Sequence, residues 1–409
     1  MSDLPHVPQS LLLQWHVTER CNLRCAHCYQ EGPVPAELAL PKLLQILAQF
    51  TELLASLRKS AEPARFPAHL TLTGGEPFVR EDFMELLEII AAQREAFTFA
   101  VLTNGTFIDA ARARTLRRLG PRFVQVSVEG TPATHDRIRG SGTFEQTVAA
   151  IRALRAEHIP TLISFTAHRG NFREFPEVVR LGRKLGANRV WADRFIPEGQ
   201  SREAREMVLT PSETREFFQI MRQSRPQGVR GWYGCEVAMH RALQFLMGGG
   251  DPYHCTAGDS LLTVLPDGGL CPCRRLPIPV GNLLEQPLQA LYQESELFRR
   301  LRDPAQISPT CAACCYARLC RGGLKCLAYA LHGDPFQPDP GCWAAQEVPV
   351  RACQETGAAS KMAWRTPRLL TPDTEVSESQ AAHGGFKDHG SDRNHVGALL
   401  LESQQALAL

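Results

Sequence analysis

Glu19-Arg20-Cys21-Asn22-Leu23-Arg24-Cys25-Ala26-His27-Cys28-Tyr29 is the stretch of sequence on which the interpretation of this chain depends. Its cysteines, Cys21, Cys25 and Cys28, follow the spacing C-x3-C-x2-C and place three thiolates within eight residues. A structural zinc site normally has four protein ligands, so three cysteines leave such a site one ligand short. An iron–sulfur cube held by three cysteines keeps one iron open for a substrate or cofactor.

Two other kinds of site could use the same cysteines. His27 could complete a zinc knuckle, or the three thiols could be half of a disulfide framework. The chain has 14 cysteines, of which three lie in residues 21–28, ten lie in residues 235–342 and one, Cys353, stands apart. Disulfide-rich secreted domains are short and spread their cysteines, and reducing compartments disfavour disulfides. The distribution therefore favours two metal-binding zones.

Length, charge and hydropathy argue against several classes of protein. The 409 residues leave room for two or three domains with a large core. Lys and Arg number 45 against 43 Asp and Glu, so the net charge of +2 gives no electrostatic reason to bind nucleic acid. No apolar run approaches the roughly 18 residues of a membrane span, and no secretory signal pattern is present. We expect a cytoplasmic protein that binds neither nucleic acid nor membrane.

Strand and helix patterns alternate over residues 8–200 and predict an α/β fold. Between the strand candidates lie amphipathic patterns, such as the one-sided spacing of Leu43, Ile46 and Phe50. A strand–helix unit repeated six times is typical of a parallel sheet with crossover helices, and we predict a partial (β/α)6 TIM-like barrel. The six strand candidates are Leu11–Val17, His69–Thr73, Phe97–Leu102, Phe123–Val128, Thr161–Thr166 and Arg189–Ile196.

The remainder of the chain divides into three segments by composition. Residues 201–234 contain a polar stretch and a helix pattern, and we interpret them as a bridge. Residues 235–345 are rich in Cys, Gly and Pro, with one helix expected around Leu288–Leu301, as in small domains that bound metal helps to fold. Residues 346–409 lose periodicity, so we expect a disordered tail with no catalytic role.

The turn after the second predicted strand has the residues of a ligand-binding turn. It reads Thr73-Gly74-Gly75-Glu76-Pro77 and lies at the edge of the barrel where active sites form. Paired glycines allow close backbone approach to a ligand, and Glu76 offers an acceptor to a cationic group. An ordinary Gly-Gly turn is the alternative, which the neighbouring three-cysteine loop weakens.

The next two strands end in further polar residues. Asn104 follows the third strand, and Val126-Ser127-Val128-Glu129-Gly130 ends the fourth, with Arg139 nine residues beyond. Ser127 could bind a ribose hydroxyl, and Arg139 could bind a carboxylate through its planar guanidinium. Strand-end turns and a surface ion pair are the alternatives for these residues.

Together these motifs resemble the radical S-adenosylmethionine (SAM) superfamily over roughly residues 10–200. The cysteine spacing is similar to that family's cluster motif, with His27 where an aromatic residue is usual. The Gly-Gly-Glu-Pro turn resembles the motif that contacts the SAM amino group, and the resemblance places Ser127 and Arg139 at the ribose and carboxylate. The residues it implies for SAM binding are Tyr29, Gly74, Gly75, Glu76, Pro77, Asn104, Ser127 and Arg139.

The resemblance also implies the chemistry. Cys21, Cys25 and Cys28 would hold a [4Fe-4S] cluster whose open iron chelates SAM, and one electron would break a carbon–sulfur bond. The 5′-deoxyadenosyl radical released would abstract a hydrogen from an unactivated carbon, while the barrel positions and shields it. A reductant such as flavodoxin or ferredoxin would supply the electron.

The second cysteine zone resembles the SPASM domain, an extension of radical SAM enzymes that carries up to two auxiliary iron–sulfur clusters. Five residues separate Cys320 from Cys326, where the family has three, and Gly322 and Gly323 could absorb the excess. The resemblance implies an inner cluster held by Cys255, Cys273 and Cys326. It implies an outer cluster held by Cys311, Cys314, Cys320 and Cys342.

The remaining cysteines leave the inner cluster without an obvious fourth ligand. Cys235 or Cys271 could supply it; otherwise that iron is open and could bind a substrate sulfur or nitrogen. Each spare cysteine, including Cys315 and Cys353, could instead be a small buried hydrophobe. The C-x2-C pair of this zone could also bind zinc.

Three functions are compatible with the sequence. The resemblance favours a maturase, an oxidoreductase that modifies a peptide or protein side chain. Sulfatase maturases carry an acid just after the cysteine equivalent to Cys273, and Arg274 argues against that activity. The second function is catalysis on a small molecule such as a haem precursor, with Arg194, Arg274 and Arg275 as candidates to bind propionates. The third is a non-catalytic iron–sulfur or zinc scaffold, which would not cleave SAM after reduction.

Overall fold

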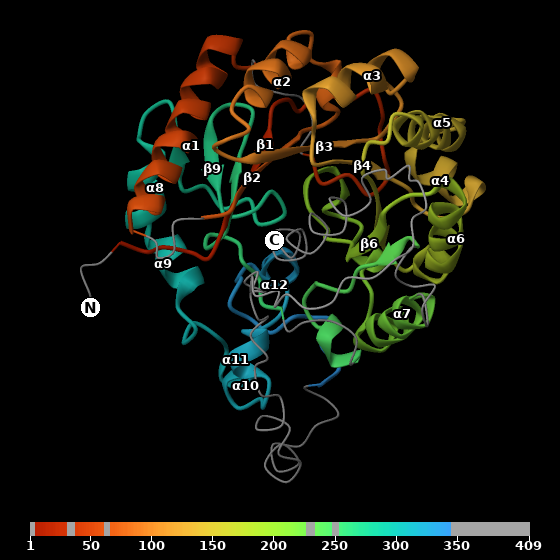
Figure 1. The fold of residues 1–409 in the computed structure, drawn as a ribbon. Coiled ribbons are helices and arrows are strands. Elements are labelled where there is room, and N and C mark those ends of the chain that lie inside the picture. The colour runs from red at the N-terminus through yellow and green to blue at the C-terminus, as the bar shows by residue number, and fades with distance from the viewer. Residues whose placement is uncertain (1–4, 31–36, 61–65, 226–233, 248–252, 345–409) are drawn as a thin grey trace, which may run out of the picture.

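Ten strands of the part of the chain that the structure describes form one sheet, in the order β10-β9-β8-β1-β2-β3-β4-β5-β6-β7 (Figure 1). Strands β1 to β8 are parallel to one another, whereas β9 pairs with both β8 and β10 in the antiparallel direction. The strands are β1 (Leu11–His16), β2 (Ala68–Thr73), β3 (Thr98–Thr103), β4 (Phe123–Ser127), β5 (Thr161–Ala167), β6 (Arg189–Arg194), β7 (Glu236–Val237), β8 (Leu261–Val264), β9 (Gly269–Cys271) and β10 (Gly281–Asn282). This computed structural model describes residues 5–30, 37–60, 66–225, 234–247 and 253–344.

Helices cover the outer side of the curved sheet, as Figure 1 shows for α1 to α7. Helices α8 and α9 lie beside α1, and α10 to α12 lie together on another side of the molecule. The parallel sheet with outer helices confirms the predicted α/β fold and partial barrel. The helices are α1 (Leu40–Ser60), α2 (Phe83–Ala91), α3 (Ala110–Leu119), α4 (Pro132–Arg139), α5 (Thr143–Ala156), α6 (Phe175–Leu185), α7 (Pro211–Ser224), α8 (Leu288–Glu294), α9 (Glu296–Arg302), α10 (Pro309–Ala312), α11 (Ala317–Cys320) and α12 (Lys325–His332).

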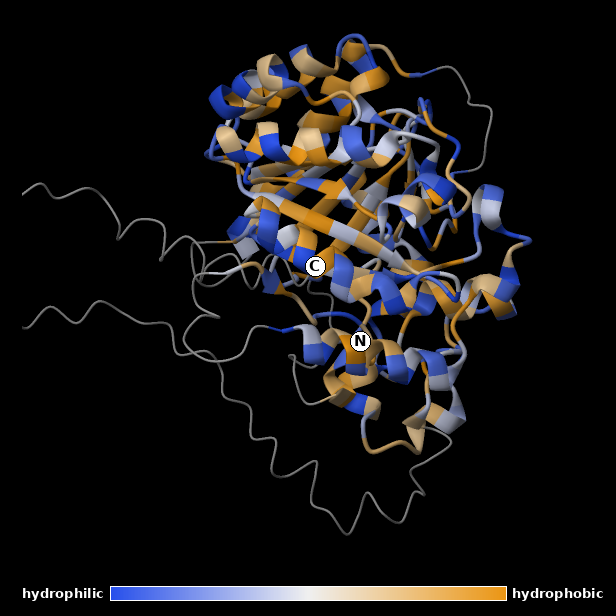
Figure 2. Ribbon diagram, turned by 90° about the vertical axis from the view of Figure 1, so that its right-hand side faces the viewer, coloured by the Kyte–Doolittle hydropathy of each residue, from blue (hydrophilic) through white to orange (hydrophobic). Residues whose placement is uncertain are grey.

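The main hydrophobic core lies between the sheet and these helices. Leu43, Ile46 and Phe50 of α1 are fully buried, because their spacing directs all three towards the sheet. In Figure 2 the strands are mostly apolar, whereas the outer helices mix apolar and polar residues. The other side of the sheet faces the barrel interior, where Leu102, Phe123 and Leu162 form part of a smaller apolar cluster.

The parallel register brings the strand ends to one edge of the barrel. His16, the last residue of β1, pairs with Thr73, the last residue of β2, and the predicted strands agree with the observed ones to within two residues. The cysteine loop after β1 and the glycine turn after β2 therefore begin side by side.

The cysteine-rich region contributes a strand to the barrel sheet. Leu261 of β8 pairs with Leu12 of β1, so the second zone continues the sheet at the edge where the chain began. The helix expected around Leu288–Leu301 is two helices, α8 and α9. Ser295 separates them because its backbone leaves the helical conformation (ψ 125°) and its hydroxyl accepts a hydrogen bond from the Phe298 amide, which starts a new helix.

The predicted bridge contains helix α7, which begins with a capping box. The Thr210 hydroxyl accepts from the Glu213 amide, and the Glu213 carboxylate accepts from the Thr210 amide. The predicted tail, residues 346–409, lies outside the described residues. None of the helices in the described ranges is both long enough and apolar enough to cross a bilayer.

Candidate active site

The three cysteines of the first motif lie together in the loop after β1. Cys21, Cys25 and Cys28 are half-buried free thiols. Burial raises the pKa of the Cys25 thiol to about 11, Arg139 lowers it, and the neighbouring Cys28 and Cys21 thiolates raise it further. These mutual effects mean that the thiols converge, and a metal would have to deprotonate them on binding.

The glycine turn after β2 lies flat against the cysteine loop. The Gly75 amide donates to the Thr18 carbonyl at 2.8 Å, and the Glu76 amide donates to the Arg20 carbonyl at 2.8 Å. A Cβ atom added to Gly74 would lie 2.2 Å from the Thr18 oxygen, and one added to Gly75 would lie 2.3 Å from the Arg20 oxygen. Only glycines allow this approach.

Glu76 is fully buried behind this turn and connects β2 to the end of β3. Its carboxylate accepts from the Thr103 hydroxyl at 2.8 Å, the Asn104 amide at 2.7 Å and the Phe78 amide at 3.3 Å. Burial raises the pKa of Glu76 to about 7, although these hydrogen bonds oppose the rise. A carboxylate has about four acceptor positions, so one remains for an ammonium group. Pro77 follows as the first residue of a short 3-10 helix.

Asn104 reaches from the end of β3 to the cysteine loop. Its side-chain nitrogen donates to the Asn22 side-chain oxygen at 2.9 Å and lies 3.9 Å from Cys21 Sγ. Ser127, at the end of β4, accepts a hydrogen bond from the Ser164 hydroxyl at 3.3 Å. The structure thus brings Asn104 to the thiols.

Glu129 holds the predicted carboxylate-binding arginine in place. It is fully buried, and its Oε1 accepts from Arg139 Nη2 at 2.6 Å and lies 3.1 Å from His27 Nε2. Arg139 Nη1 lies 4.0 Å from Cys25 Sγ. Burial alone would raise the pKa of Glu129, but Arg139 and then His27 keep it well below its usual range. The sequence alone gave Glu129 no role. Its position, directly after a strand and before a glycine, is the feature that could have marked it as a functional acid.

Arg274 connects the cysteine loop to the second zone. Its Nη2 donates to the Gln30 side chain at 2.9 Å, and its guanidinium lies 5.7 Å from the centre of the Tyr29 ring. Gln30 in turn donates to the Gly74 carbonyl at 2.6 Å. Burial raises the pKa of Tyr29 to about 12, which keeps its phenol neutral.

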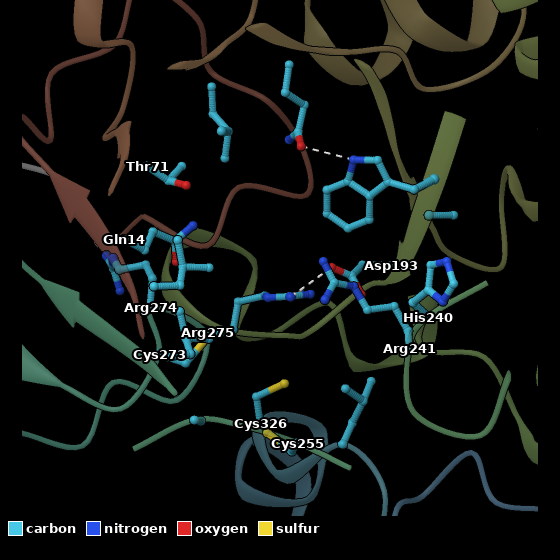
Figure 3. Close-up of a pocket in the computed structure, with 18 of the residues that line it drawn as sticks. Gln14, Thr71, Asp193, His240, Arg241, Cys255, Cys273, Arg274, Arg275 and Cys326 are labelled. Atoms are coloured by element: carbon cyan, nitrogen blue, oxygen red, sulfur yellow. Dashed lines mark hydrogen bonds and ion pairs between the residues drawn. The ribbon is translucent and has the colours of Figure 1, made fainter. Parts of the chain in front are cut away.

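A pocket lined by both apolar and charged residues lies inside the barrel, next to this connection (Figure 3). The cavity itself has a volume of about 140 Å³. Asp193 accepts from Arg275 at 2.8 Å and lies 3.4 Å from Arg241, while Trp191 donates to Gln125 at 2.9 Å. Four arginines are among its lining residues: Arg189, Arg241, Arg274 and Arg275.

The three arginines predicted to bind propionates do not all lie in the same place. Arg274 and Arg275 line the pocket, and Arg241 and Arg189, which the sequence did not single out, join them. Arg194 is not among the lining residues, because it forms a buried ion pair with Asp339 at 2.5 Å.

Three thiols of the second zone line one wall of this pocket. Cys255, Cys273 and Cys326 all line the pocket, and Figure 3 draws Cys273 next to Arg275, with Cys326 and Cys255 beyond it. Burial raises the pKa of Cys326, Arg275 lowers it, and the Cys273 and Cys255 thiolates raise it further. The set of residues inferred for the inner cluster is therefore assembled around one space.

Four further thiols of this zone form a second group. Burial raises the pKa of Cys320, Asp339 adds to the rise, and then the thiolates of Cys342, Cys311 and Cys314 raise it further. The extra residues before Cys326 are accommodated by positive φ angles at Arg321 (49°), Gly322 (89°) and Gly323 (80°). This turn directs Cys320 to the outer group and Cys326 to the inner one.

The two candidates for a fourth ligand of the inner cluster lie in different places. Cys235 is buried against α6, where a Cβ on Gly182 would lie 3.3 Å from its sulfur. Cys271 is buried beside Cys273, and its thiol donates to the Cys273 carbonyl at 3.6 Å. Cys353 lies outside the described residues.

The chemistry of the donor sets suits iron–sulfur clusters. The residues expected to hold the clusters are all cysteines, and they are present as free thiols in the structure. Thiolates are the ligands that hold iron–sulfur clusters, so the residues present fit the clusters that the sequence implies.

Comparison with protein-family models finds two matches. Residues 15–182 match the radical SAM superfamily, and residues 255–315 match SPASM, an iron–sulfur cluster-binding domain. The first match includes the cysteine loop, the glycine turn and Arg139. The second includes Cys255, Cys273, Cys311 and Cys314.

Similar curated proteins have two kinds of name. The AdoMet-dependent heme synthase of Methanosarcina barkeri is 29% identical over 356 residues, covering 81% of this chain and 95% of that protein. The PqqA peptide cyclase of Gluconobacter oxydans is 29% identical over 348 residues, covering 83% and 91%.

Solved structures share the fold. Native anSMEcpe with bound AdoMet has a TM-score of 0.66 at 17% identity and covers 82% of this chain and 95% of its own. SuiB of Streptococcus suis bound to S-adenosylmethionine has a TM-score of 0.62 at 14% identity, covering 82% and 77%.

Proposed function

This chain belongs to the radical SAM superfamily and carries a SPASM domain with auxiliary iron–sulfur clusters, and from that premise we propose its substrate class. We propose that it cleaves SAM reductively and abstracts hydrogen from a carboxylate-bearing small molecule of the haem-precursor class. The single observation that carries the substrate class is the group of four arginines lining the barrel pocket.

The SAM site is supported by groups around the first three cysteines. Cys21, Cys25 and Cys28 would hold the cluster, which with SAM supplies the radical chemistry when bound. Arg139, held by Glu129 and 4.0 Å from Cys25 Sγ, is suited to the SAM carboxylate. Glu76 keeps one acceptor position for the SAM ammonium group.

The pocket has the charge and position expected of a substrate site. It extends from Tyr29, next to the first cluster site, to the thiols of the inner group. Asp193 is the one carboxylate among the described residues that line it, against four guanidinium groups. Two of these arginines also have carboxylate partners behind the lining, since Arg189 pairs with Glu236 at 2.7 Å and Arg274 lies 3.5 Å from Glu19. Guanidinium groups bind carboxylates bidentately, and the low dielectric of a buried pocket strengthens that attraction. The 29% identity to a heme synthase supports the same class.

SAM cleavage tests the first half of the proposal. Anaerobically reconstituted protein should form 5′-deoxyadenosine when reduced, and alanine at Cys21, Cys25 and Cys28 should abolish it. Cys235→Ala is the matched control, because Cys235 is a buried thiol packed against α6. Cleavage that persists in the triple variant would refute the assignment.

Porphyrin binding tests the substrate class. An iron porphyrin with free propionates should shift its absorbance on binding, and its methyl ester should bind at least about tenfold more weakly. Arg241→Gln should weaken binding of the acid by a similar factor, since a charged hydrogen bond contributes about 1.5–3 kcal/mol. Arg117→Gln on the exposed side of α3 is the control and should bind normally. Equal binding of acid and ester would reject the class.

A peptide is the second candidate substrate. The 29% identity to a PqqA peptide cyclase supports it. Co-expression with a short peptide encoded beside this gene, followed by mass spectrometry, tests this candidate. A SAM-dependent mass change that needs Cys21 would favour the peptide over the porphyrin.

A further inference from the structure

His16, the last residue of β1, is fully buried without a hydrogen-bond partner for its ring. Neither of its ring nitrogens is bonded to any other of the described residues. Among the buried histidines of these ranges, it alone lacks a partner at both nitrogens. Unpaired buried polar groups destabilise a fold and are rare in native proteins, so each one points to a ligand or a functional role.

The His16 ring faces the barrel interior beside the pocket. Side chains alternate along a strand, and Leu12 and Gln14 of β1 line the pocket, so His16 continues the same inward face. The centre of its ring lies 6.4 Å from that of Tyr29, which also lines the pocket. His16 pairs in register with Thr73, directly before the glycine turn. The ring therefore lies at the end of the pocket nearest the first cysteine loop.

Arg274 brings a second unpaired donor to this end of the pocket. Its Nη2 donates to the Gln30 side chain at 2.9 Å and lies 3.5 Å from a Glu19 carboxylate oxygen. Its Nε atom is buried and has no partner in the part of the chain that the structure describes. Its guanidinium lies 5.7 Å from the centre of the Tyr29 ring, so Arg274 and His16 flank the same tyrosine.

The two groups together have the chemistry of a carboxylate-binding site. Burial, and then the charge of Arg274, lower the pKa of His16 well below its usual value, so its ring is neutral. A neutral imidazole offers one N–H donor, and Arg274 Nε offers a second donor that belongs to a permanent positive charge. A carboxylate accepts from two donors at once and balances that charge.

We propose that His16 and Arg274 bind one carboxylate of the substrate at the end of the pocket next to the first cysteine loop. This inference rests on the proposed function, which puts a carboxylate-bearing molecule in the pocket. Figure 3 draws Arg274 beside Gln14 and Arg241 beside Asp193, so these two arginines belong to different parts of the pocket. The carboxylate at His16 and Arg274 therefore decides which side chain of the substrate points towards the SAM cluster.

Porphyrin binding to the full-length holoprotein tests this subsite. The probe is the iron porphyrin with free propionates, compared with its methyl ester. His16→Leu should reduce the ratio of acid affinity to ester affinity at least about tenfold, as expected when a hydrogen bond to a charged group is lost. Trp15→Phe is the control, because Trp15 is the next residue of β1 and faces the other way, into the main core. It should keep the wild-type ratio.

Thermal unfolding separates a binding role for His16 from a structural one. His16→Leu removes two unpaired polar atoms from a buried site, so without porphyrin the variant should melt at or above the wild-type temperature. A histidine that holds the barrel together would lower the melting temperature when replaced. A melting temperature below that of the wild type, or an unchanged acid-to-ester ratio, would overturn the proposal.

Double variants test whether both groups bind the same carboxylate. Arg274→Lys keeps the positive charge but lacks the Nε donor, and its effect on acid binding should not add fully to that of His16→Leu. Arg241→Gln acts on another part of the pocket, so its effect should add. Full additivity of His16→Leu with Arg274→Lys would overturn the shared site.

Two further outcomes identify which inference has failed. If the wild type binds acid and ester equally, the proposed substrate class is wrong. If the wild type prefers the acid and His16→Leu keeps that preference, only the subsite is wrong. A loss of SAM affinity in His16→Leu that exceeds its loss of porphyrin affinity would assign the histidine to SAM and also overturn the proposal.

Discussion

Two glutamates, each fully buried, differ in charge because their partners differ. Glu129 faces the Arg139 guanidinium and His27, and these hold its pKa far below the usual range despite burial. Glu76 receives only neutral donors from the backbone and Thr103, so burial dominates and raises its pKa to about 7. Glu129 is therefore a permanent anion that orients Arg139, whereas Glu76 ionises near neutrality.

Glu76→Gln tests this difference through the pH dependence of stability. The folded-state pKa of about 7 lies above the ordinary 4.5, so the native state binds the proton more tightly than the unfolded chain. The stability this provides is present below pH 4.5 and lost as the pH rises through about 7. Relative to the variant, the wild type should therefore lose up to about 3 kcal/mol across that window.

Thermal unfolding of both proteins at pH 5 and pH 8 measures this loss. Glu145→Gln, at an exposed position of α5, is the control and should show no pH-dependent difference from wild type. If the difference in stability between the wild type and Glu76→Gln were the same at both pH values, the raised pKa of Glu76 would be contradicted.

The strand-end loops of the proposed SAM site are held together by backbone contacts as well as by side chains. The glycine turn after β2 and the cysteine loop after β1 share hydrogen bonds because their strands are parallel neighbours in register. The short distance between these loops excludes any side chain at Gly74 or Gly75. The turn is therefore part of the scaffold that shapes the cysteine loop.

Gly75→Ala should disrupt that loop. The added Cβ would lie 2.3 Å from the Arg20 oxygen and 2.5 Å from the Glu19 oxygen, and backbone atoms cannot move aside as a flexible side chain can. We expect a loss of about 3 kcal/mol or more in stability and loss of the SAM cluster, measured by unfolding and iron content.

Gly120→Ala is the matched control for this substitution. It has nothing within 4 Å of the new Cβ, but its φ of +70° costs about 1–2 kcal/mol. It should keep its iron. A Gly75→Ala protein with full iron content and the stability of the control would contradict the steric argument.

At the scale of the whole molecule, one pocket connects the first thiol group with the inner one. Tyr29 follows the first group and lines the pocket, whose far wall carries the inner group. The second cysteine zone is held against the barrel in two places. Strand β8 pairs with β1, and Arg274 donates to the Gln30 side chain. Under the proposed function, a substrate in the pocket would lie between the SAM cluster and the inner cluster.

Iron analysis and Mössbauer spectroscopy test this arrangement. Three cubes correspond to about 12 irons per chain. Alanine at Cys21, Cys25 and Cys28 should remove about four irons, and alanine at the inner or outer group should each remove about four more. Cys235→Ala should lose none, because that thiol lies apart from all three groups. Zinc in place of iron, or an inner-group variant with full iron, would contradict the prediction.

Local patterns in the sequence predicted the barrel and the first cysteine site. Alternating strand and helix periods determine which residues face a core, so the strand bounds were predicted to within two residues. The C-x3-C-x2-C spacing is also a local pattern. It predicts a metal site because its three ligands lie within one loop and need no distant partner.

Contacts between distant parts of the chain were settled by tertiary structure. The sequence could not assign Arg241 to the pocket or Arg194 to Asp339, 145 residues away. Nor could it pair β8 with β1 or give Glu129 its role beside Arg139. The physical reason is that a local sequence pattern determines the type of secondary structure and the ligands within one loop. The partner of a buried charge depends instead on which strands become neighbours once the chain has folded.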